Sequence, residues 1–269
     1  MDRNTRPLAL VTGASSGIGT ALARELARHG HDLVLTARRA APMEALAAEL
    51  RALGAGASVI PADLSKPGAA AALADDLAAG GLDIDILVNN AGLGALGRFD
   101  RMDPSRIGDM LQVNIVALTE LTRLLLPGMI ARGHGRIMLV SSVAGFQPGP
   151  RMAVYFATKA YVTSLGEALA YELRRTGVSV TVLCPGATET EFFSVAGATN
   201  SSMSARMRRM MRADDVARIG YRGLAAGRRL VIAGMMNKVL GLAGHFAPHR
   251  LSLPFTDMLM MAPRDERAG

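Results

Sequence analysis

The sequence is poor in the residues that mark several large classes of protein. Its 269 residues include one cysteine, Cys184, and no tryptophan, and aromatic residues make up only 4%. A single cysteine cannot form an internal disulfide, which excludes a secreted protein built on a disulfide framework and favours a reducing compartment. No run combines basic and aromatic residues into a surface on which bases could stack, so the sequence argues against a nucleic-acid partner.

Long apolar runs are also missing. No segment reaches the roughly 18 consecutive apolar residues that a membrane span requires. The uncharged N-terminal stretch, residues 7–23, is interrupted by glycines and small polar residues, whereas the core of a signal peptide is continuously apolar. Half of the residues are apolar and the net charge is only +7, which excludes intrinsic disorder. We therefore predict a soluble, cytoplasmic protein.

What the sequence does contain is a regular alternation of short apolar runs and longer helical patterns. The runs are nearly continuous in apolar character, as expected for strands covered on both faces of a parallel sheet. They predict an α/β fold, a single doubly wound domain with about seven parallel strands flanked by helices. The expected strands are residues 8–12, 32–36, 58–62, 85–89, 136–141, 178–184 and 229–233, and the expected helices are residues 17–29, 41–53, 67–79, 104–132 and 153–176.

A glycine-rich turn follows the first strand and opens the first helix. Glycines at this place allow a tight turn and a close approach of backbone to a pyrophosphate, whose charge meets the N-terminus of the helix. The segment therefore predicts a dinucleotide site. Its residues 12–19 read TGASSGIG, and the expected contacts are Gly13, Ser15, Ser16, Gly17, Ile18 and Gly19.

The end of the second strand indicates which dinucleotide is bound. An acidic residue there binds the 2′-hydroxyl of NAD, whereas an arginine accommodates the 2′-phosphate of NADP. This strand is followed by Arg38 and Arg39, and no acid is present. We predict NADP(H) as the cofactor, with Arg38 as the main contact and Arg39 in support, although an exposed loop in an arginine-rich protein would look the same.

Tyr155 and Lys159 stand at the start of a predicted helix. Residues four apart share one helix face, so the ammonium can lie near the phenol, favour its charged form and lower its pKa. A phenol tuned in this way can give a proton to a carbonyl oxygen or take one from an alcohol.

Taken together, these motifs resemble the classical short-chain dehydrogenase/reductase family, which implies a Rossmann-type fold. The resemblance runs from about Leu8 to Gly234. Besides the glycine-rich turn, Tyr155 and Lys159, it rests on Asp63, Leu64, Asn89, Asn90, Ala91, Gly92, Asn114, Ser142, Pro185 and Gly186.

The resemblance implies a role for each catalytic residue. Tyr155 is the general acid/base, and Ser142 bonds the substrate oxygen, with the adjacent Ser141 as the weaker candidate. Lys159 binds the nicotinamide ribose and assists Tyr155, while Asn114 holds a water that links Lys159 to solvent. Hydride then passes between nicotinamide C4 and a ketone or aldehyde. Asn114 also has a purely structural interpretation, since it could satisfy backbone at a helix kink.

The resemblance also implies contacts along the rest of the cofactor. Asp63 and Leu64 meet the adenine, and the segment from Asn89 through Ala91 to Gly92 lines the adenosine ribose. Alone, Asp63 could instead cap the third helix, and the two asparagines could form a plain turn. The five histidines lack metal-ligand spacing, so no metal is expected. The segment that brackets the carboxamide contributes Pro185, Gly186, Thr188 and Thr190.

The last part of the chain bears on the substrate. Residues 191–212 would form the family's substrate lid, and their phenylalanines and methionines favour a hydrophobic carbonyl substrate. The domain would end near residue 234, and the apolar extension, residues 235–269, would pack on the pocket, on a subunit face or on a membrane surface, with packing on its own domain preferred. The lid carries a basic cluster of Arg206, Arg208, Arg209 and Arg212.

Several alternatives stay open at this point. The basic cluster fits a solvated helix face, a dock for acyl carrier protein or coenzyme A in a 3-oxoacyl-thioester reductase, or contact with anionic lipid. We expect a homodimer through the two long helices, with a tetramer as the other possibility. A non-catalytic protein that senses NADP(H) or scaffolds partners is the hypothesis from a different class.

Overall fold

The computed structural model describes residues 6–192, 196, 210–246 and 249–260. Seven strands form one parallel sheet in the order β3-β2-β1-β4-β5-β6-β7. This confirms the predicted single α/β domain of Rossmann type. The strands are β1 (Leu8–Thr12), β2 (Asp32–Thr36), β3 (Ala57–Val59), β4 (Ile86–Asn89), β5 (Gly135–Val140), β6 (Val178–Cys184) and β7 (Leu230–Ile232).

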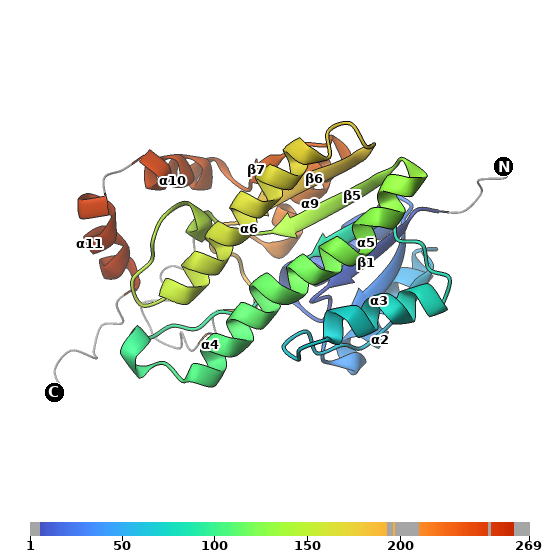
Figure 1. Ribbon diagram of the computed structural model, residues 1–269, viewed down its shortest axis with the longest axis horizontal. Helices are drawn as coiled ribbons and strands as arrows, with labels where there is room; N and C mark the ends of the chain where they lie inside the picture. The colour runs from blue at the N-terminus through green and yellow to red at the C-terminus, as the bar shows by residue number, and fades with distance from the viewer. Residues whose placement is uncertain (1–5, 193–195, 197–209, 247–248, 261–269) are drawn as a thin grey trace.

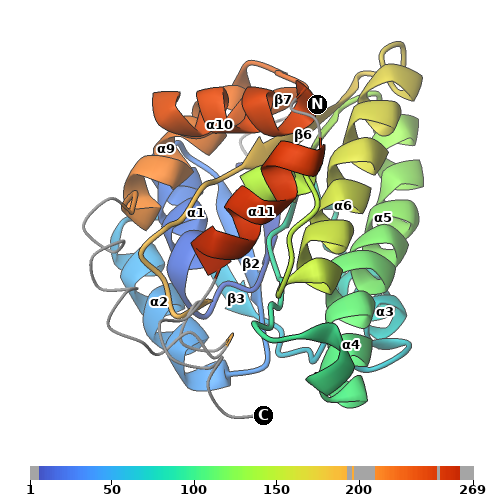
Figure 2. The same ribbon diagram turned by 90° about the vertical axis from the view of Figure 1, so that its left-hand side faces the viewer.

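Helices cover both faces of the sheet, as Figures 1 and 2 show. One face carries α1 (Gly17–Arg28), α2 (Ala40–Ala52) and α9 (Ala213–Ala225), and α1 packs against both of the others. The other face carries α3 (Ala69–Ala79), α4 (Pro104–Leu111), α5 (Leu118–Arg132) and α6 (Ala153–Glu172). The strand order reverses between β1 and β4, and in open α/β sheets ligands bind outside the carboxyl ends of the strands at such a point.

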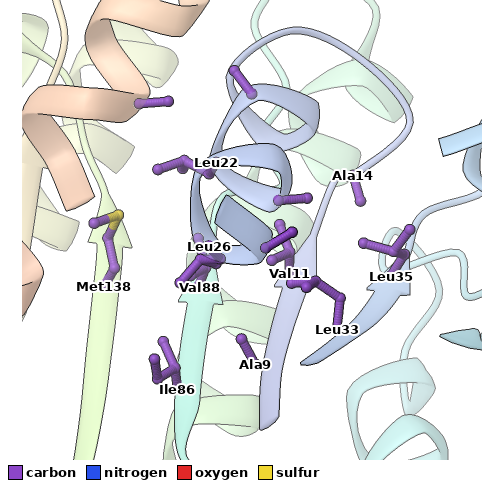
Figure 3. Packing of buried hydrophobic residues seen from close by; sticks show 14 of the residues in the cluster. Ala9, Val11, Ala14, Leu22, Leu26, Leu33, Leu35, Ile86, Val88 and Met138 are labelled. Carbon is purple, nitrogen blue, oxygen red and sulfur yellow. The ribbon is translucent and has the colours of Figure 1, made fainter. Parts of the chain in front are cut away.

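The core explains why the strands read as continuous apolar runs. Figure 3 shows Leu22 and Leu26 of α1 above Val11, Val88 and other apolar side chains of the sheet. All of these are almost completely buried. A second apolar cluster fills the opposite side of the sheet beneath α3, α5 and α6. The rigid sheet therefore fixes where the loops at its carboxyl edge begin.

The helix predicted over residues 104–132 is interrupted in the structure. Between α4 and α5 lies a π-helical segment, η2 (Gln112–Ala117), which contains Asn114. Such wider turns are frequently found at functional sites. Within the described residues, the stretch Pro104–Arg132 is the one helix with the length and mean hydropathy, 1.4, of a membrane span. It packs against α3, α6 and the sheet, as a core helix does.

Two more helices follow β7. α10 (Met235–Phe246) packs against β7 and against the short 3₁₀ helix η3 (Val143–Phe146). At Gly241 a Cβ would lie 3.1 Å from the ring of Phe146, which shows how closely the two elements approach. α11 (His249–Met260) crosses in front of the sheet in Figure 2. This part of the extension therefore folds onto its own domain.

Candidate active site

The glycine-rich turn is held in a shape that side chains would prevent. Gly13 has φ of 66°, and a Cβ there would lie 2.9 Å from Ala91 Cα. A Cβ at Gly19 would lie 2.2 Å from the carbonyl oxygen of Gly13. The turn therefore requires glycine at both positions, and its backbone is open to a ligand at the carboxyl edge of β1.

Asn90 clamps this turn to the loop that follows β4. Its Nδ2 donates hydrogen bonds to the carbonyl oxygens of Thr12 and Gly13, at 2.9 and 3.3 Å. Thr12 Oγ1 accepts in return from the backbone N–H groups of Asn90 and Ala91, both at 2.9 Å. The sequence does not show which of the two adjacent asparagines faces the turn, so this task of the Asn90 side chain could not be predicted.

The N-terminus of α1 fits an anionic group. Ser16 is the N-cap residue, its side chain makes no capping bond, and no acidic residue stands in the first turn. The first N–H groups of the helix are thus available to a phosphate, whose charge the helix dipole favours. Ser15 and Ile18 lie beside this end and are half-buried. Thr190 reaches the same place, because a Cβ on Gly17 would lie 2.7 Å from Thr190 Cγ2.

The two arginines after β2 differ in their surroundings. Arg39 donates to Glu191 in a 2.8 Å ion pair, and both side chains are about half exposed. Arg38 is exposed and lies close enough to Asp63 to stabilise its carboxylate. Arg39 is thus engaged by a carboxylate that follows β6, whereas the Arg38 guanidinium stands at the exposed end of β2.

Asp63 does not cap the third helix. It accepts hydrogen bonds from the backbone and the hydroxyl of Ser65, at 3.1 and 2.8 Å, whereas α3 begins at Ala69 after Gly68. Burial tends to raise the pKa of Asp63, but the bonds from Ser65 and the charge of Arg38 outweigh it, and the net pKa is lowered. The carboxylate is thus ionised at the edge of the sheet. Leu64 beside it is buried in the core.

The side chain of Asn89 has a structural task instead of the predicted place along the ribose. It is almost fully buried, and its Nδ2 donates to Thr122 Oγ1 of α5 at 2.8 Å. Successive side chains of a strand point to opposite faces, so Asn89 enters the helix layer while Asn90 turns to the glycine-rich segment. Ala91 lies next to Gly13 of the glycine-rich turn, and Gly92 lies next to the ammonium of Lys159.

Tyr155, in the first turn of α6, meets Ser142, the N-cap residue of η3. Burial raises the pKa of Tyr155 to about 12, and a hydrogen bond with Ser142 opposes that rise. The predicted lowering by Lys159 is therefore wrong for this structure, in which desolvation dominates and Lys159 Nζ lies 5.8 Å from the ring centre. At neutral pH the phenol keeps its proton and can donate it.

The two adjacent serines differ in their surroundings. Ser141 is buried, and its hydroxyl is bonded to Lys159 O at 2.8 Å and to Thr163 Oγ1 at 2.7 Å. Ser142 is half-buried and accepts from the N–H of Ala144 at 3.1 Å. Only Ser142 is therefore within reach of both Tyr155 and a ligand.

Lys159 and Asn114 flank the backbone of Gly92. A Cβ on Gly92 would lie 3.4 Å from Lys159 Nζ and 3.5 Å from Asn114 Oδ1. Asn114 accepts from the N–H of Leu93 at 2.8 Å and donates to Leu93 O and Thr158 Oγ1 at 2.9 and 3.0 Å. The Asn114 side chain thus fixes the loop after β4 against α6. This structural task is carried out next to Lys159.

Lys159 is buried, and its ammonium donates to Val140 O at 2.8 Å. Burial lowers the pKa of Lys159 to about 8. In the unfolded chain a lysine titrates near ~10.4. Folding is therefore penalised while Lys159 is charged. The penalty begins to fall as the pH rises through 8 and is gone above about 10.4, because between these two pKa values the unfolded chain binds more protons than the folded one.

This shift predicts how stability depends on pH in the absence of nucleotide. Between pH 7 and 9.5 the free energy of unfolding should gain about 2 kcal/mol in the wild type relative to Lys159→Met, at about 1.36 kcal/mol per pH unit above 8. Urea denaturation of both proteins across this range measures the difference. Tyr155 does not change this difference below pH 10, because its phenol keeps its proton in both the folded and the unfolded chain. Parallel curves for the two proteins would contradict the buried, shifted lysine.

An apolar wall stands beside Tyr155. Ala144, Met152 and Phe156 are buried, and they pack with Tyr155 and two half-buried residues, Leu96 and Phe192. The rings of Phe192 and Tyr155 are 5.1 Å apart. The phenol therefore faces surroundings suited to the hydrocarbon part of a ligand.

The segment after β6 contacts α10 of the extension and two other parts of the chain. A Cβ on Gly186 would lie 2.3 Å from Asn237 of α10. Thr188 pairs with Met211 in an isolated β-bridge, and its hydroxyl donates to Gly186 O at 3.0 Å. Val143 donates its N–H to Pro185 O at 2.9 Å. The four residues predicted to bracket the carboxamide thus line the same edge as Ser142.

Other candidate groups carry no chemistry here. Cys184 is fully buried, and burial raises the pKa of its thiol to about 12, so it is not a nucleophile. Among the described residues, no group of three or more histidine, cysteine or carboxylate side chains could hold a metal ion. Of the basic cluster, Arg206, Arg208 and Arg209 lie outside the described residues, while Arg212 is exposed and lies 3.7 Å from Asp214.

Comparison with known proteins agrees with this geometry. The family described as short chain dehydrogenase matches residues 7–236. The oxidoreductase UcpA of Escherichia coli (strain K12) is 38% identical over 187 residues, which are 69% of this chain and 71% of UcpA.

Two solved structures cover nearly the whole chain. A short-chain dehydrogenase from Sphingobium yanoikuyae in complex with NADPH has 34% identity and a TM-score of 0.80, and the alignment covers 98% of each chain. The bulky-bulky ketone specific alcohol dehydrogenase from Comamonas testosteroni has 30% identity and a TM-score of 0.74, over 98% of this chain and 96% of that one. The glycine-rich turn, the Ser142, Tyr155 and Lys159 group and the extent of these matches agree, and the chain belongs to the short-chain dehydrogenase/reductase family of oxidoreductases.

Proposed function

We propose that this protein is an NADPH-dependent carbonyl reductase, or alcohol dehydrogenase in the reverse direction, that acts on hydrophobic ketones or aldehydes. The observation that carries the proposal is the position of the Tyr155 phenol, which lies near Ser142 and against the apolar wall of Met152, Phe156 and Phe192. The specificity for bulky ketones in the name of the Comamonas testosteroni relative supports the same substrate class.

Each catalytic side chain has a definable part in the reduction. The nicotinamide, when bound, supplies the hydride to the carbonyl carbon. Ser142 and Tyr155 both hold the carbonyl oxygen, and Tyr155 donates the proton that turns the developing alkoxide into an alcohol. Lys159, beside Gly92, would hold the nicotinamide ribose, and Asn114 keeps the loop at Gly92 in place next to it.

NADP(H) is the cofactor that the residues fit best. The N-terminus of α1, the open turn at Gly13 and the exposed guanidinium of Arg38 can hold a pyrophosphate and a 2′-phosphate. No acidic residue follows β2 to bind a 2′-hydroxyl. The NADPH bound by the Sphingobium yanoikuyae relative is consistent with this assignment.

Exchanging the two residues after β2 should reverse cofactor choice. In Ala37→Asp/Arg38→Leu the charge-assisted contact with the phosphate is lost and an acceptor for the ribose is gained. The ratio of kcat/KM for NADPH to that for NADH should fall about 100-fold, since bonds to charged groups are worth about 1.5–3 kcal/mol. Steady-state kinetics with both cofactors measure it, and Arg228→Leu, an exposed arginine between α9 and β7, is the control. An unchanged ratio would refute the assignment.

The function itself is tested by NADPH consumption against a panel of carbonyl compounds. The panel should grade free ketones and aldehydes by size, and add 3-oxoacyl thioesters of coenzyme A and acyl carrier protein. We expect turnover of the apolar ketones. Preference for the thioesters would favour the alternative reductase, in which the basic cluster docks the carrier. NADPH binding without turnover of any compound would favour a sensor or scaffold.

The proposal also covers the domain bounds, the cellular location and the oligomeric state. We assign residues 1–234 to the catalytic domain, with the lid at 191–212, and residues 235–269 to an extension. We place the protein in the cytoplasm. A homodimer through the two long helices agrees with the exposed apolar side chains that these helices carry, namely Leu111, Val116, Leu124, Ile130, Tyr161 and Tyr171. A tetramer remains the alternative, and light scattering distinguishes the two.

A further inference from the structure

The helix α11 is tied to the loop that precedes the catalytic helix. Arg151 Nε donates to Asp257 Oδ1 at 2.9 Å, across 106 residues of sequence. The side chains are 21% and 37% exposed, so the pair is less open to solvent than the ion pair of Arg39 and Glu191. An ion pair that is partly shielded from water is less weakened by competing solvent and salt than one on an open surface.

Arg151 is unusual in its backbone as well. Among the described residues it is the one residue other than glycine with a positive φ, 63°. Such a conformation persists in a residue with a Cβ only where the surroundings enforce it. Here the carbonyl of Arg151 accepts from the N–H of Gly97 at 2.8 Å, while its side chain is held by Asp257. The residue is thus fixed from two sides.

What Arg151 fixes is the start of the catalytic helix. Met152 is the N-cap residue of α6, it belongs to the apolar wall, and its carbonyl accepts from Phe156 at 3.0 Å. Tyr155 lies in this same first turn. The conformation of Arg151 therefore bears on how Met152 and the apolar wall are presented to a ligand.

The burial pattern of α11 shows which side it turns to the domain. Thr256 is buried, and Leu253 and Asp257 are half-buried, at positions that share one face of a helix. Arg250, Pro254 and Met258 are exposed, on the neighbouring strip of the helix surface. Asp257 therefore lies at the edge of the side that α11 turns to the domain, where it meets Arg151.

We propose that Arg151 and Asp257 form a latch that docks α11 over the substrate site, and that Asp257 is thereby a positioning residue for the binding of hydrophobic carbonyl substrates. The proposal rests on the function proposed above. With the latch closed, α11 and the apolar wall enclose a substrate together. With the latch broken, the wall loses its cover and a substrate buries less apolar surface.

Kinetics of Asp257→Ala test the effect on substrate binding. KM for apolar ketones should rise about 5- to 10-fold with kcat within twofold of the wild type, while the Kd for NADPH, measured by fluorescence, stays unchanged. Arg151→Gly removes the same contact and suits the positive φ. It should raise KM by the same factor as Asp257→Ala, and the KM of the variant that carries both substitutions should be no higher than that of either single variant. Asp215→Ala, which breaks the 3.1 Å ion pair with Arg218 on α9, is the matched control and should change nothing.

Hydrogen exchange tests the latch without any turnover. In Asp257→Ala the amides of residues 249–260 and 147–156 should exchange faster, and those of residues 8–36 at the wild-type rate. Equal exchange in α11 of the variant and the wild type, or additive effects of the two single variants on KM, overturns the latch. If no carbonyl compound is reduced, the proposed function fails, and the exchange data still decide whether the latch exists.

Discussion

Replacing Tyr155 by phenylalanine is expected to lower kcat about 10³-fold and to leave the Kd for NADPH within a factor of about two. General acid catalysis by a positioned side chain contributes about 10²–10⁴-fold, and the substitution removes the group that is placed to donate the proton. The substitution removes one oxygen and keeps the ring that packs against Phe192. NADPH oxidation in the presence of an apolar ketone, and fluorescence titration with NADPH, measure the two quantities.

Tyr161→Phe provides the control for this result. It makes the same change on the same helix, at a tyrosine whose hydroxyl is bonded to Thr119 at 3.0 Å and which is exposed. Its kcat should match that of the wild type. If Tyr155→Phe retained more than a tenth of wild-type kcat, the proton would have to come from elsewhere, and the proposed mechanism would be wrong.

Gly19→Ala is expected to disrupt the nucleotide site and to lower the free energy of unfolding by about 3 kcal/mol. The new Cβ would lie 2.2 Å from Gly13 O and 2.5 Å from Asn90 Nδ2. Both atoms belong to the clamp between the loops after β1 and β4, and a backbone oxygen cannot move aside as the end of a flexible side chain can. Overpacking of this kind costs about 1–3 kcal/mol, and the lost bonds of Asn90 add to it. The Kd for NADPH should rise at least about 100-fold.

Gly108→Ala is the matched substitution. Gly108 also lies within a helix, α4, but nothing lies within 4 Å of the place where its Cβ would be. Because alanine favours the helix by up to about 1 kcal/mol, this variant should be slightly more stable than the wild type and bind NADPH normally. Thermal melting and NADPH titration of both variants compare them. Equal behaviour of the two would mean that the close approach at Gly19 is not needed.

The fold could be predicted because its signals are local and repeated. Each buried strand of a parallel sheet is apolar on both faces, so the central strands are visible in the sequence as short apolar runs. The alternation of strands and helices then implies right-handed crossover connections between parallel strands. The π-helical segment around Asn114 could not be foreseen in this way. The apolar spacing continues through residues 104–132, and the interruption comes from bonds to Leu93, a residue of another loop.

The site was predictable only as far as its motifs are contiguous. The glycine-rich turn and the spacing of Tyr155 and Lys159 are visible in the sequence, whereas the pairing of Arg39 with Glu191 joins residues 152 positions apart. The same limit applies to the phenol. Sequence spacing shows that a lysine is near Tyr155, but the direction of the pKa shift depends on burial, which only the three-dimensional packing defines.

Three consecutive residues after β6 touch three different parts of the site. Thr190 lies on Gly17 of the phosphate turn, Glu191 pairs with Arg39, and Phe192 packs on the ring of Tyr155. A nucleotide bound at the turn therefore contacts the same short segment that packs on the phenol, so its binding is coupled to the place where the ketone must enter. We therefore expect an ordered kinetic sequence, in which the nucleotide binds first and leaves last and the alcohol departs before it. Product inhibition by NADP⁺ should accordingly be competitive with NADPH at every concentration of ketone.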